Sequence, residues 1–359
     1  MAQATPGIRL GRNGRLGVVV LDRQEALNAL TREMIQALSL QLLAWKDDPE
    51  VAAVLIKAAP GRAFCAGGDV RHIYQLGKAG QTDDALAFYR EEYRLNWRIF
   101  RYPKPYIALL DGITLGGGAG VSVHGSHRIA TERVSFAMPE TGIGFFPDVG
   151  GTYFLPRCPG EVGTYLGLTG QRIGAPDCLF AGIATQFVPS ERLEALEGVL
   201  STLPSGAANG EVDTVLASFA KPAGPAPLED TAENLDEILA GDSLPAVPQA
   251  AERDPSGTGA ALLEQLRGRS PLSLAVTFAQ LRKGGACLSF EEAMQLEFRL
   301  TARFLRSEDF YEGVRAAVID KDRQPRWSYP DVASVPQEVV DNYFATLDGA
   351  ELELDWQGL

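Results

Sequence analysis

The sequence is poor in cysteine and has no long apolar segment. Its four cysteines form no Cys-x-x-Cys pair, which argues against a zinc ribbon or a thioredoxin-like redox motif. At this density a disulfide framework is not expected either, so the thiols should be reduced and structural. No stretch approaches the roughly 18 consecutive apolar residues of a membrane-spanning helix. We therefore expect a chain that neither crosses a membrane nor depends on disulfides.

Histidine is scarce as well, which limits the metal sites that the chain can build. Only His124 and His127 have a spacing that could place two metal ligands on a helix, and no acidic or cysteine ligand nearby completes the set. Packing or surface roles are favoured for both, so we predict no metal site.

Basic residues are outnumbered by acidic ones. The chain carries 33 Lys and Arg against 46 Asp and Glu, a formal net charge of -13. This balance argues against a nucleic-acid surface, which needs clustered Lys and Arg. An anionic small ligand stays compatible with it, because a few basic side chains or helix-start amides can bind phosphate inside an acidic protein. The N-terminal segment has neither the apolar core of a signal peptide nor the composition of a transit peptide, so we expect a cytoplasmic protein.

Short apolar runs alternate with amphipathic segments over the first half of the chain. Residues 16–21, 51–56 and 106–110 are each typical of a buried strand, and Ile129 and Ala130 indicate a fourth. Thr31 is typical of a helix N-cap, because apolar residues follow it at helical spacing. Strands that alternate with helices predict an α/β layered fold.

Composition divides the chain into three parts. Residues 1–200 carry the alternating pattern and should form the core. Residues 201–260 are rich in Pro, Ala and acidic residues, which predicts a loosely ordered insertion or a set of short helices. Residues 261–359 should form a helical C-terminal region, with an amphipathic segment over 288–305.

Two glycine-rich motifs follow predicted strands. Residues 63–69 read Ala-Phe-Cys-Ala-Gly-Gly-Asp, where small residues let the backbone approach a ligand, although an ordinary strand-to-helix turn explains them equally well. Residues 111–120 place three glycines before an expected helix, whose free N–H groups would stabilise negative charge. A dinucleotide-binding turn is disfavoured there, because the third glycine of its pattern would fall on Val121.

A third motif, residues 136–151, holds two carboxylates among apolar and glycine residues. Glu140 and Asp148 lie eight residues apart. A carboxylate in such surroundings tends to have a raised pKa and suits acid–base or nucleophilic work. For each residue alone, a helix-capping or turn role is the simpler interpretation. All three motifs together predict an acyl-transfer site, with backbone donors for a thioester oxygen and a carboxylate to drive cleavage.

These segments resemble the crotonase (enoyl-CoA hydratase/isomerase) superfamily, and in detail its 3-hydroxyisobutyryl-CoA hydrolase branch. The resemblance covers about residues 15–330 and weakens over 203–258. It is carried by Phe-Cys-Ala-Gly-Gly-Asp at 64–69, Gly-Ile-Thr at 112–114, Ser-Val-His-Gly at 122–125, Met-Pro-Glu-Thr at 138–141, Phe-Pro-Asp-Val-Gly-Gly at 146–151 and Asp-Phe-Tyr-Glu-Gly-Val-Arg-Ala at 309–316. It implies a crotonase-type fold with repeated ββα turns and a helical C-terminal region.

The resemblance also implies roles for individual residues. The amides of Gly68 and Gly117 would form an oxyanion hole, and Glu140 would be the catalytic carboxylate. Asp148 would lie near the substrate hydroxyl, and Glu92 would be a further acid on the substrate side.

The CoA part of the substrate would lie against the backbone near Ala66 and Asp69 and against the loop 23–27, which includes Ala26. Arg23 and Lys57 are candidate phosphate contacts, although solvated surface charge is the commoner role for either residue alone.

One departure separates two branches of the superfamily. The hydratases of this superfamily carry a second catalytic glutamate where this chain has Gly120, and a glycine cannot hold or deprotonate water. The resemblance therefore favours hydrolysis of a short-chain 3-hydroxyacyl-CoA, such as 3-hydroxyisobutyryl-CoA in valine degradation. An enoyl-CoA hydratase or isomerase that uses Glu140 alone, and a non-catalytic CoA-binding protein, stay open as alternatives.

The implied hydrolysis requires no metal or redox cofactor, because CoA is part of the substrate. Glu140 would either attack the carbonyl to give an anhydride or deprotonate an attacking water. The superfamily often forms trimers or hexamers, so a homo-oligomer is expected unless the 201–260 segment blocks the contacts.

Overall fold

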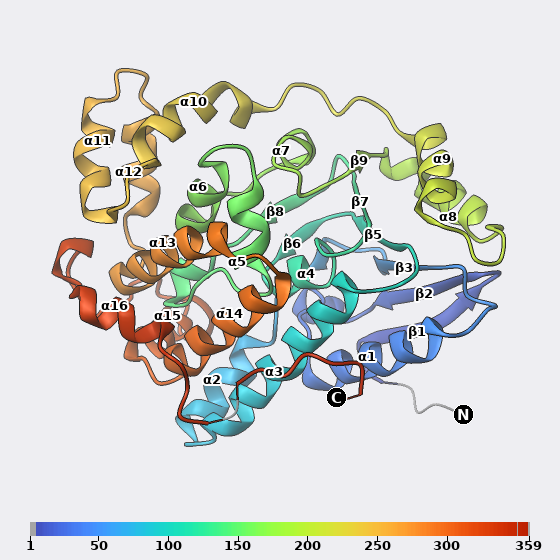
Figure 1. The fold of residues 1–359 in the computed structure, drawn as a ribbon, viewed down its shortest axis with the longest axis horizontal. Coiled ribbons are helices and arrows are strands. Elements are labelled where there is room, and N and C mark those ends of the chain that lie inside the picture. Colours follow the sequence, from blue (N-terminus) through green and yellow to red (C-terminus); the bar gives the residue numbers. More distant parts are fainter. Residues whose placement is uncertain (1–4, 350, 358–359) are drawn as a thin grey trace.

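Two sheets form the centre of the computed structural model, which describes residues 5–349 and 351–357 (Figure 1). The larger sheet has the strand order β1-β2-β3-β5-β7-β9 and is parallel except for β1, which pairs antiparallel with β2. In that order its strands span Ile8–Asn13, Leu16–Leu21, Ala53–Ala58, Tyr106–Leu110, His127–Ala130 and Gln186–Phe187. The smaller sheet is parallel, with the order β4-β6-β8 and the strands Ala63–Cys65, Ile113–Leu115 and Ser135–Ala137.

Three strands of the large sheet are each followed by a short strand of the small sheet and then by a helical turn. β3 leads to β4 and α2 (Val70–Lys78), and β5 leads to β6 and α4 (Gly117–Gly120). β7 leads to β8 and a 3-10 turn, Glu140–Ile143. These are the repeated ββα turns that the sequence resemblance implies. Because the short strands run parallel, the residues that follow them meet at one edge of the small sheet.

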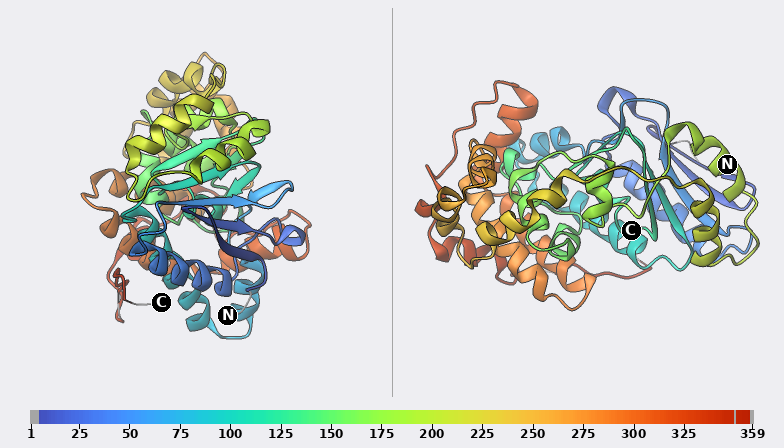
Figure 2. Two further views of the ribbon diagram at one scale, coloured as in Figure 1. Left: turned by 90° about the vertical axis from the view of Figure 1, so that its right-hand side faces the viewer. Right: turned by 90° about the horizontal axis from the view of Figure 1, so that it is seen from above.

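The two faces of the large sheet are covered by different helices, because successive side chains of a strand point to opposite sides. Val19 and Ile56 join one core cluster with α1 (Arg32–Lys46). Val18 and Leu55 join another cluster with α8 (Leu193–Leu200) and α9 (Asn209–Phe219). The left view of Figure 2 shows α1 below the sheet and α8 and α9 above it. Burial on both faces explains why residues 16–21 read as a continuous apolar run.

Helices fill most of the chain between the strands. The remaining helices of the first 200 residues are α3 (Thr82–Phe100), α5 (Gly151–Phe154), α6 (Val162–Thr169), α7 (Ala175–Phe180) and α8 (Leu193–Leu200). Helix α1 begins where the sequence predicts, because Thr31 Oγ1 accepts a hydrogen bond from Met34 N at 3.3 Å. The strand predicted over 51–56 begins two residues later, because Val51 N donates to Asp48 O in a turn.

The segment 203–258 is a set of helices and is packed into the core. It contains α9 (Asn209–Phe219), α10 (Pro227–Leu239) and α11 (Val247–Arg253), and α12 (Thr258–Leu266) follows. Leu216 of α9 is buried against the large sheet, and Leu235 of α10 belongs to the main core cluster. In Figure 1 the link between α9 and α10 crosses the top of the molecule. Two forms were predicted for this segment, a loosely ordered insertion and a set of short helices, and the structure shows the helices.

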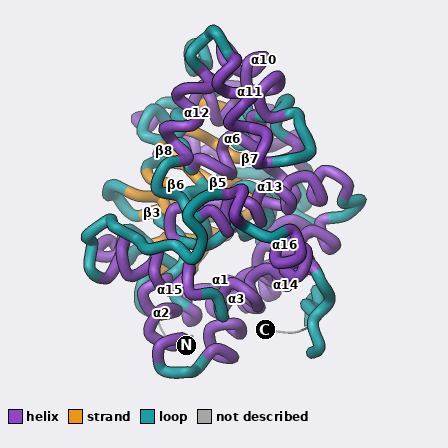
Figure 3. Tube along the Cα trace, turned by 90° about the vertical axis from the view of Figure 1, so that its left-hand side faces the viewer, coloured by secondary structure: helices purple, strands orange, loops and turns teal. Residues whose placement is uncertain are grey.

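The C-terminal region is helical, as expected. It contains α13 (Pro271–Ala286), α14 (Phe290–Phe304), α15 (Glu308–Val314), a π-helical turn (Arg315–Ile319) and α16 (Gln337–Phe344). Figure 3 shows that these helices, with α2 and α3 beneath and α10 to α12 above, cover the end of the molecule away from β1 and β2. In the part of the chain that the structure describes, no helix combines the length and the apolar character that crossing a membrane requires.

Candidate active site

The three sequence motifs meet in one cavity of about 190 Å³. Its walls are built by the residues that follow the strands of the small sheet, by α3 and by the π-helical turn of the C-terminal region. The polar groups among them include the backbones of Gly68 and Gly117, the carboxyl groups of Glu92, Glu140 and Asp148, and the hydroxyl-bearing Tyr89. The structure therefore brings together all five residues for which the resemblance implied a role at the reacting end of the substrate.

The amides of Gly68 and Gly117 lie side by side. A Cβ atom built on Gly117 would lie 3.0 Å from Gly68 N, so only glycine allows this approach. Gly116 has a φ of 43°, in the left-handed region, which turns the chain into the single helical turn of α4. Neither the Gly68 nor the Gly117 amide donates a hydrogen bond to another described residue. Two adjacent free N–H donors facing a cavity are suited to bind an oxyanion.

Glu140 begins the 3-10 turn after β8 and lies beside these amides. Its Oε1 atom would be 2.9 Å from a Cβ atom built on Gly116, the residue before Gly117. Its Oε2 atom is buried and has no hydrogen-bond partner among the described residues. Burial raises the pKa of Glu140 well above its ordinary value, and the charge of Asp148 raises this pKa further. An unpartnered carboxyl group next to two free amides is the arrangement that acyl transfer needs.

Asp148 is held in the same cavity by a hydrogen bond from α3. Its Oδ2 atom accepts from the Tyr93 hydroxyl at 3.0 Å, and that hydroxyl lies 2.6 Å from Thr301 Oγ1 of α14. Burial raises the pKa of Asp148 to about 7, although the bond from Tyr93 acts in the opposite direction. The sequence offered no sign of Tyr93, which is 55 residues away along the chain.

Glu92 comes from α3, one residue before Tyr93, and is 2% exposed. Its Oε1 atom would lie 2.6 Å from a Cβ atom on Gly117 and has no partner in the described chain. Burial raises the pKa of Glu92, and the charge of Asp148 adds to this. Since like charges in a buried site oppose one another's ionisation, these carboxyl groups can supply both a base and a proton donor near neutral pH.

Several buried side chains fix the loop that carries Asp148, through long-range contacts that no sequence motif indicated. Glu297 of α14 accepts from Gly150 N and from Thr152 N, both at 2.8 Å. His124 Nε2 lies 2.6 Å from Val149 O, so this nitrogen must carry the proton. Val149 has a φ of 51°, a left-handed conformation that a β-branched residue adopts only when its surroundings impose it.

Two of the five proposed CoA contacts, Ala26 and Ala66, lie on adjoining backbone. Ala66 lines the cavity, and its amide donates to Leu27 O at 2.9 Å, next to the turn that contains Ala26. The loop 23–27 therefore adjoins Ala66 in the lining of the catalytic cavity, and its contact with CoA stays a prediction.

The charged candidates are engaged elsewhere. Arg23 Nη2 forms an ion pair with Asp69 Oδ2 at 2.9 Å, so these two charges satisfy each other. Lys57 pairs with Glu197 of α8 and lines a separate cavity with Asp111. The ammonium group of Lys57 therefore points to α8, and a phosphate contact of Lys57 beside Arg23 stays a prediction.

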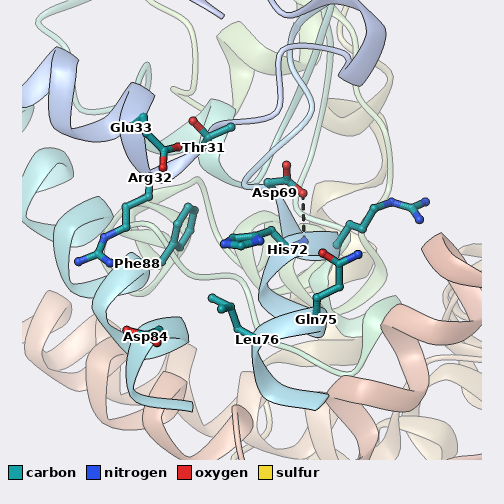
Figure 4. A pocket seen from close by; sticks show the side chains of 10 residues that line it. Thr31, Arg32, Glu33, Asp69, His72, Gln75, Leu76, Asp84 and Phe88 are labelled. Atoms are coloured by element: carbon teal, nitrogen blue, oxygen red, sulfur yellow. Dashed lines mark hydrogen bonds between the residues drawn. The ribbon is translucent and has the colours of Figure 1, made fainter. Parts of the chain in front are cut away.

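Asp69 lines a second cavity, of about 440 Å³, that shares only Phe88 with the catalytic one. Figure 4 shows Asp69, just before α2, with His72 and Gln75 of α2 on one side of this cavity and Phe88 and Arg32 on the other. The Asp69 carboxylate accepts from His72 N at 3.2 Å and so caps α2. Its first role is therefore structural, which the sequence motif did not reveal.

The position of the missing glutamate is closed by packing. A Cβ atom on Gly120 would lie 2.7 Å from Asn96 Nδ2 and 2.8 Å from Val149 Cβ. A larger side chain there would displace either the loop that carries Asp148 and Val149 or helix α3. Within the described ranges, no group of three or more His, Cys, Asp or Glu side chains is arranged to hold a metal ion.

Comparison with known proteins agrees with this site. The family model described as enoyl-CoA hydratase/isomerase matches residues 16–344. The mitochondrial 3-hydroxyisobutyryl-CoA hydrolase of Danio rerio is 44% identical over 95% of this chain and 90% of its own length. The Homo sapiens protein of the same name is 41% identical over 98% of this chain and 91% of its own length.

Two solved structures share the fold over almost the whole chain. A carnitinyl-CoA dehydratase from Mycobacterium thermoresistibile has a TM-score of 0.91 and 35% identity, and covers 99% of this chain and all of its own. An enoyl-CoA hydratase from Rhodobacter sphaeroides has a TM-score of 0.88 and 40% identity, and covers 97% of this chain and all of its own. These structures confirm the fold class predicted from the sequence.

Proposed function

Because the chain belongs to the enoyl-CoA hydratase/isomerase family, we propose that its cavity binds an acyl-CoA thioester and hydrolyses it. The substrate is 3-hydroxyisobutyryl-CoA and the products are 3-hydroxyisobutyrate and CoA, a step of valine degradation. The observation that carries the proposal is the unpartnered Glu140 carboxyl group beside the free amides of Gly68 and Gly117. The names of the curated relatives, at 41–44% identity, support the substrate.

The reaction begins when the thioester oxygen accepts hydrogen bonds from Gly68 N and Gly117 N. Negative charge develops on this oxygen in the tetrahedral state, and one such donor is worth about 2.7–4 kcal/mol. Glu140 either attacks the carbonyl carbon, giving an anhydride that water then cleaves, or deprotonates an attacking water. On both routes the C–S bond breaks, the thiolate leaves and takes up a proton, and the acyl group departs as a free acid.

Asp148 positions the substrate hydroxyl. Tyr93 occupies its Oδ2 atom, which leaves Oδ1 to accept a hydrogen bond from the 3-hydroxyl group of the acyl chain. Because Glu92 and Asp148 hold their protons more tightly than ordinary carboxyl groups do, one of them can supply a proton close to neutral pH. CoA enters as part of the substrate, and the proposal includes no other cofactor.

Hydration of an enoyl-CoA is the second candidate, favoured by the names of the two solved structures. Gly120 opposes it, because packing leaves no room there for the second glutamate of a hydratase. A non-catalytic CoA-binding role is opposed by the buried carboxyl groups of Glu140 and Asp148, which serve no structural purpose that burial would justify.

The test is to supply purified protein with 3-hydroxyisobutyryl-CoA, other short 3-hydroxyacyl-CoAs and crotonyl-CoA, and to follow free thiol and enoyl absorbance together. We expect thiol release that is fastest with 3-hydroxyisobutyryl-CoA, and no loss of enoyl absorbance. Loss of enoyl absorbance without thiol would establish the hydratase. Tight CoA binding with neither signal would establish the non-catalytic role.

A further inference from the structure

A third cavity has a volume of about 330 Å³ and is lined by His124, whose ring also contacts the loop that carries Asp148. It shares no lining residue with the catalytic cavity. Three aromatic side chains form much of its wall, Phe100, Tyr153 and Phe154, together with the aliphatic residues Val123 and Ile183. These apolar surfaces would hold the hydrocarbon part of a ligand.

The charged groups of this cavity are two arginines and no acid. Arg128 donates from Nε, Nη1 and Nη2 to the carbonyl oxygens of Ile183, Gly125 and Gly182. Arg157 donates to the carbonyl oxygens of Tyr153 and Cys287. Neither guanidinium forms an ion pair with any described residue, and Asp and Glu are absent from the described residues of the lining.

The chain has a net charge of -13, yet the described lining of this cavity holds no acidic residue to balance its two guanidinium groups. A guanidinium group carries five N–H donors. Arg128 uses three of them and Arg157 uses two in the hydrogen bonds above, so each arginine keeps donors for a ligand. Arg157 also lies 3.5 Å over the ring of Tyr153, which holds its planar group in place. A planar, fixed guanidinium matches a carboxylate in geometry and charge.

We propose that this cavity is a binding site for a small monocarboxylate with an apolar body, separate from the catalytic site. The carboxylate lies between Arg128 and Arg157, and the hydrocarbon part packs against Phe100 and Phe154. A phosphate group fits less well, because it has no apolar part to bury against these rings.

The imidazole ring of His124 can serve as a probe of ligand binding in this cavity. It lines the cavity and also donates to Val149 O, next to Asp148. Burial lowers the pKa of His124 to about 4, so its ring is neutral near pH 7 and its signals are stable there. The chain has only two other histidines, His72 and His127, so the imidazole signals can be assigned with His72→Gln and His127→Gln.

The experiment is a titration of the full chain, labelled at histidine, with isobutyrate and with isobutyramide, which has the same apolar body without the charge. Isobutyrate should shift the His124 signals saturably, and isobutyramide should not. Arg157→Gln removes one charge-assisted contact and should raise the dissociation constant of isobutyrate roughly tenfold. Arg172→Gln, an arginine outside the cavity, should leave it unchanged.

Arg157 is the residue to change because it is exposed, so its variant should fold, whereas Arg128 ties three carbonyl oxygens together. No saturable shift with isobutyrate, an equal shift with isobutyramide, or undiminished affinity in folded Arg157→Gln would each overturn the proposal. Saturation by inorganic phosphate alone would overturn the assignment of the ligand as a carboxylate.

Discussion

Three buried carboxyl groups share the catalytic cavity, so the proton of each depends on the others. The charge of Asp148 raises the pKa of Glu92 and that of Glu140, and burial raises all three. Such a cluster titrates as a unit, and its members cannot all be ionised near neutral pH. If Glu140 must be ionised to act, the rate should fall as the pH falls through the range where the cluster takes up protons.

Replacing Asp148 with Asn should move the acid limb of the kcat/KM profile to lower pH. The negative charge of Asp148 makes ionisation of Glu140 harder, so removing it lowers the pKa of Glu140. The measurement is the residual rate of thiol release at pH values from about 5 to about 9, roughly one pH unit apart, so that a shift in the pKa can be detected. An acid limb that stays in place or moves upward would show that Glu140 is not the group that titrates.

Gly120→Ala should destabilise the fold by about 1–3 kcal/mol and reduce activity, because its Cβ atom collides with Asn96 and Val149. Urea unfolding measures the loss. Gly210→Ala is the matched control, because a Cβ atom there meets nothing within 4 Å. If Gly120→Ala unfolded like wild type, the position would have room for a hydratase glutamate, and the packing argument against hydration would fail.

At the scale of elements, the loop between Pro147 and Thr152 matters most, because it joins the catalytic carboxylate to the C-terminal helices. Glu297 holds it through two backbone amides, and Gln280 Nε2 of α13 donates to Pro147 O at 2.7 Å. Together with the bond from His124, these contacts impose the left-handed conformation of Val149. The helical region that follows residue 270 therefore shapes the catalytic site from outside it.

Glu297→Gln should lower both stability and kcat, because one of the two backbone N–H groups that its oxygens bind would then face an NH2 group, which cannot accept a hydrogen bond. A lost hydrogen bond to a buried amide costs about 1–3 kcal/mol. Burial raises the pKa of Glu297 from 4.5 to about 8. Its contribution to stability is therefore complete below pH 4.5 and is lost as the pH rises through 8. The difference between variant and wild type should shrink over that range.

Urea unfolding at several pH values measures this difference, with Glu233→Gln, an exposed glutamate of α10, as control. A loss of stability that grew with pH would contradict the raised pKa. Normal kcat in Glu297→Gln would show that the loop holds Asp148 without it.

The helices of the segment 203–258 should contribute to stability as core elements do. Leu216→Ala in α9 removes a side chain that is fully buried against the large sheet, and should cost about 2–5 kcal/mol. Thr214→Ala, on the exposed side of the same helix, should cost far less. Equal unfolding midpoints for the two variants would indicate that α9 is a loosely attached insertion after all.

At the scale of the whole molecule, the sequence was most informative where a strand is long and a motif follows it. Residues 16–21 and 106–110 form strands with the predicted bounds, and Thr31 caps a helix as predicted. The strands of the small sheet could not be predicted, because three residues are too few to show a period. They are nevertheless what brings the three motifs to one edge.

The residues of the site also divide into those that could be predicted from the sequence and those that could not. Glycines and carboxylates within the motifs could be identified, because the chemistry requires those residue types after those strands. Glu297 and Tyr93 could not be, because each acts on a loop that is distant in sequence and carries no local pattern of its own. His124 lies in the Ser-Val-His-Gly motif and was expected to pack or lie at the surface, but its hydrogen bond to Val149 O could not be predicted. The pairing of Lys57 could not be predicted for the same reason, since Glu197, its partner, lies 140 residues further along.

The central claim, that Glu140 drives thioester hydrolysis beside the paired amides, is tested most directly by thiol release from 3-hydroxyisobutyryl-CoA in Glu140→Gln. This variant keeps the shape of the side chain and removes its charge. We predict a fall in kcat by a factor of about 10²–10⁴, with an unchanged fold and unchanged CoA affinity. Glu229→Gln, on the exposed face of α10, should match wild type. A folded Glu140→Gln enzyme that releases thiol at nearly the wild-type rate would contradict the account.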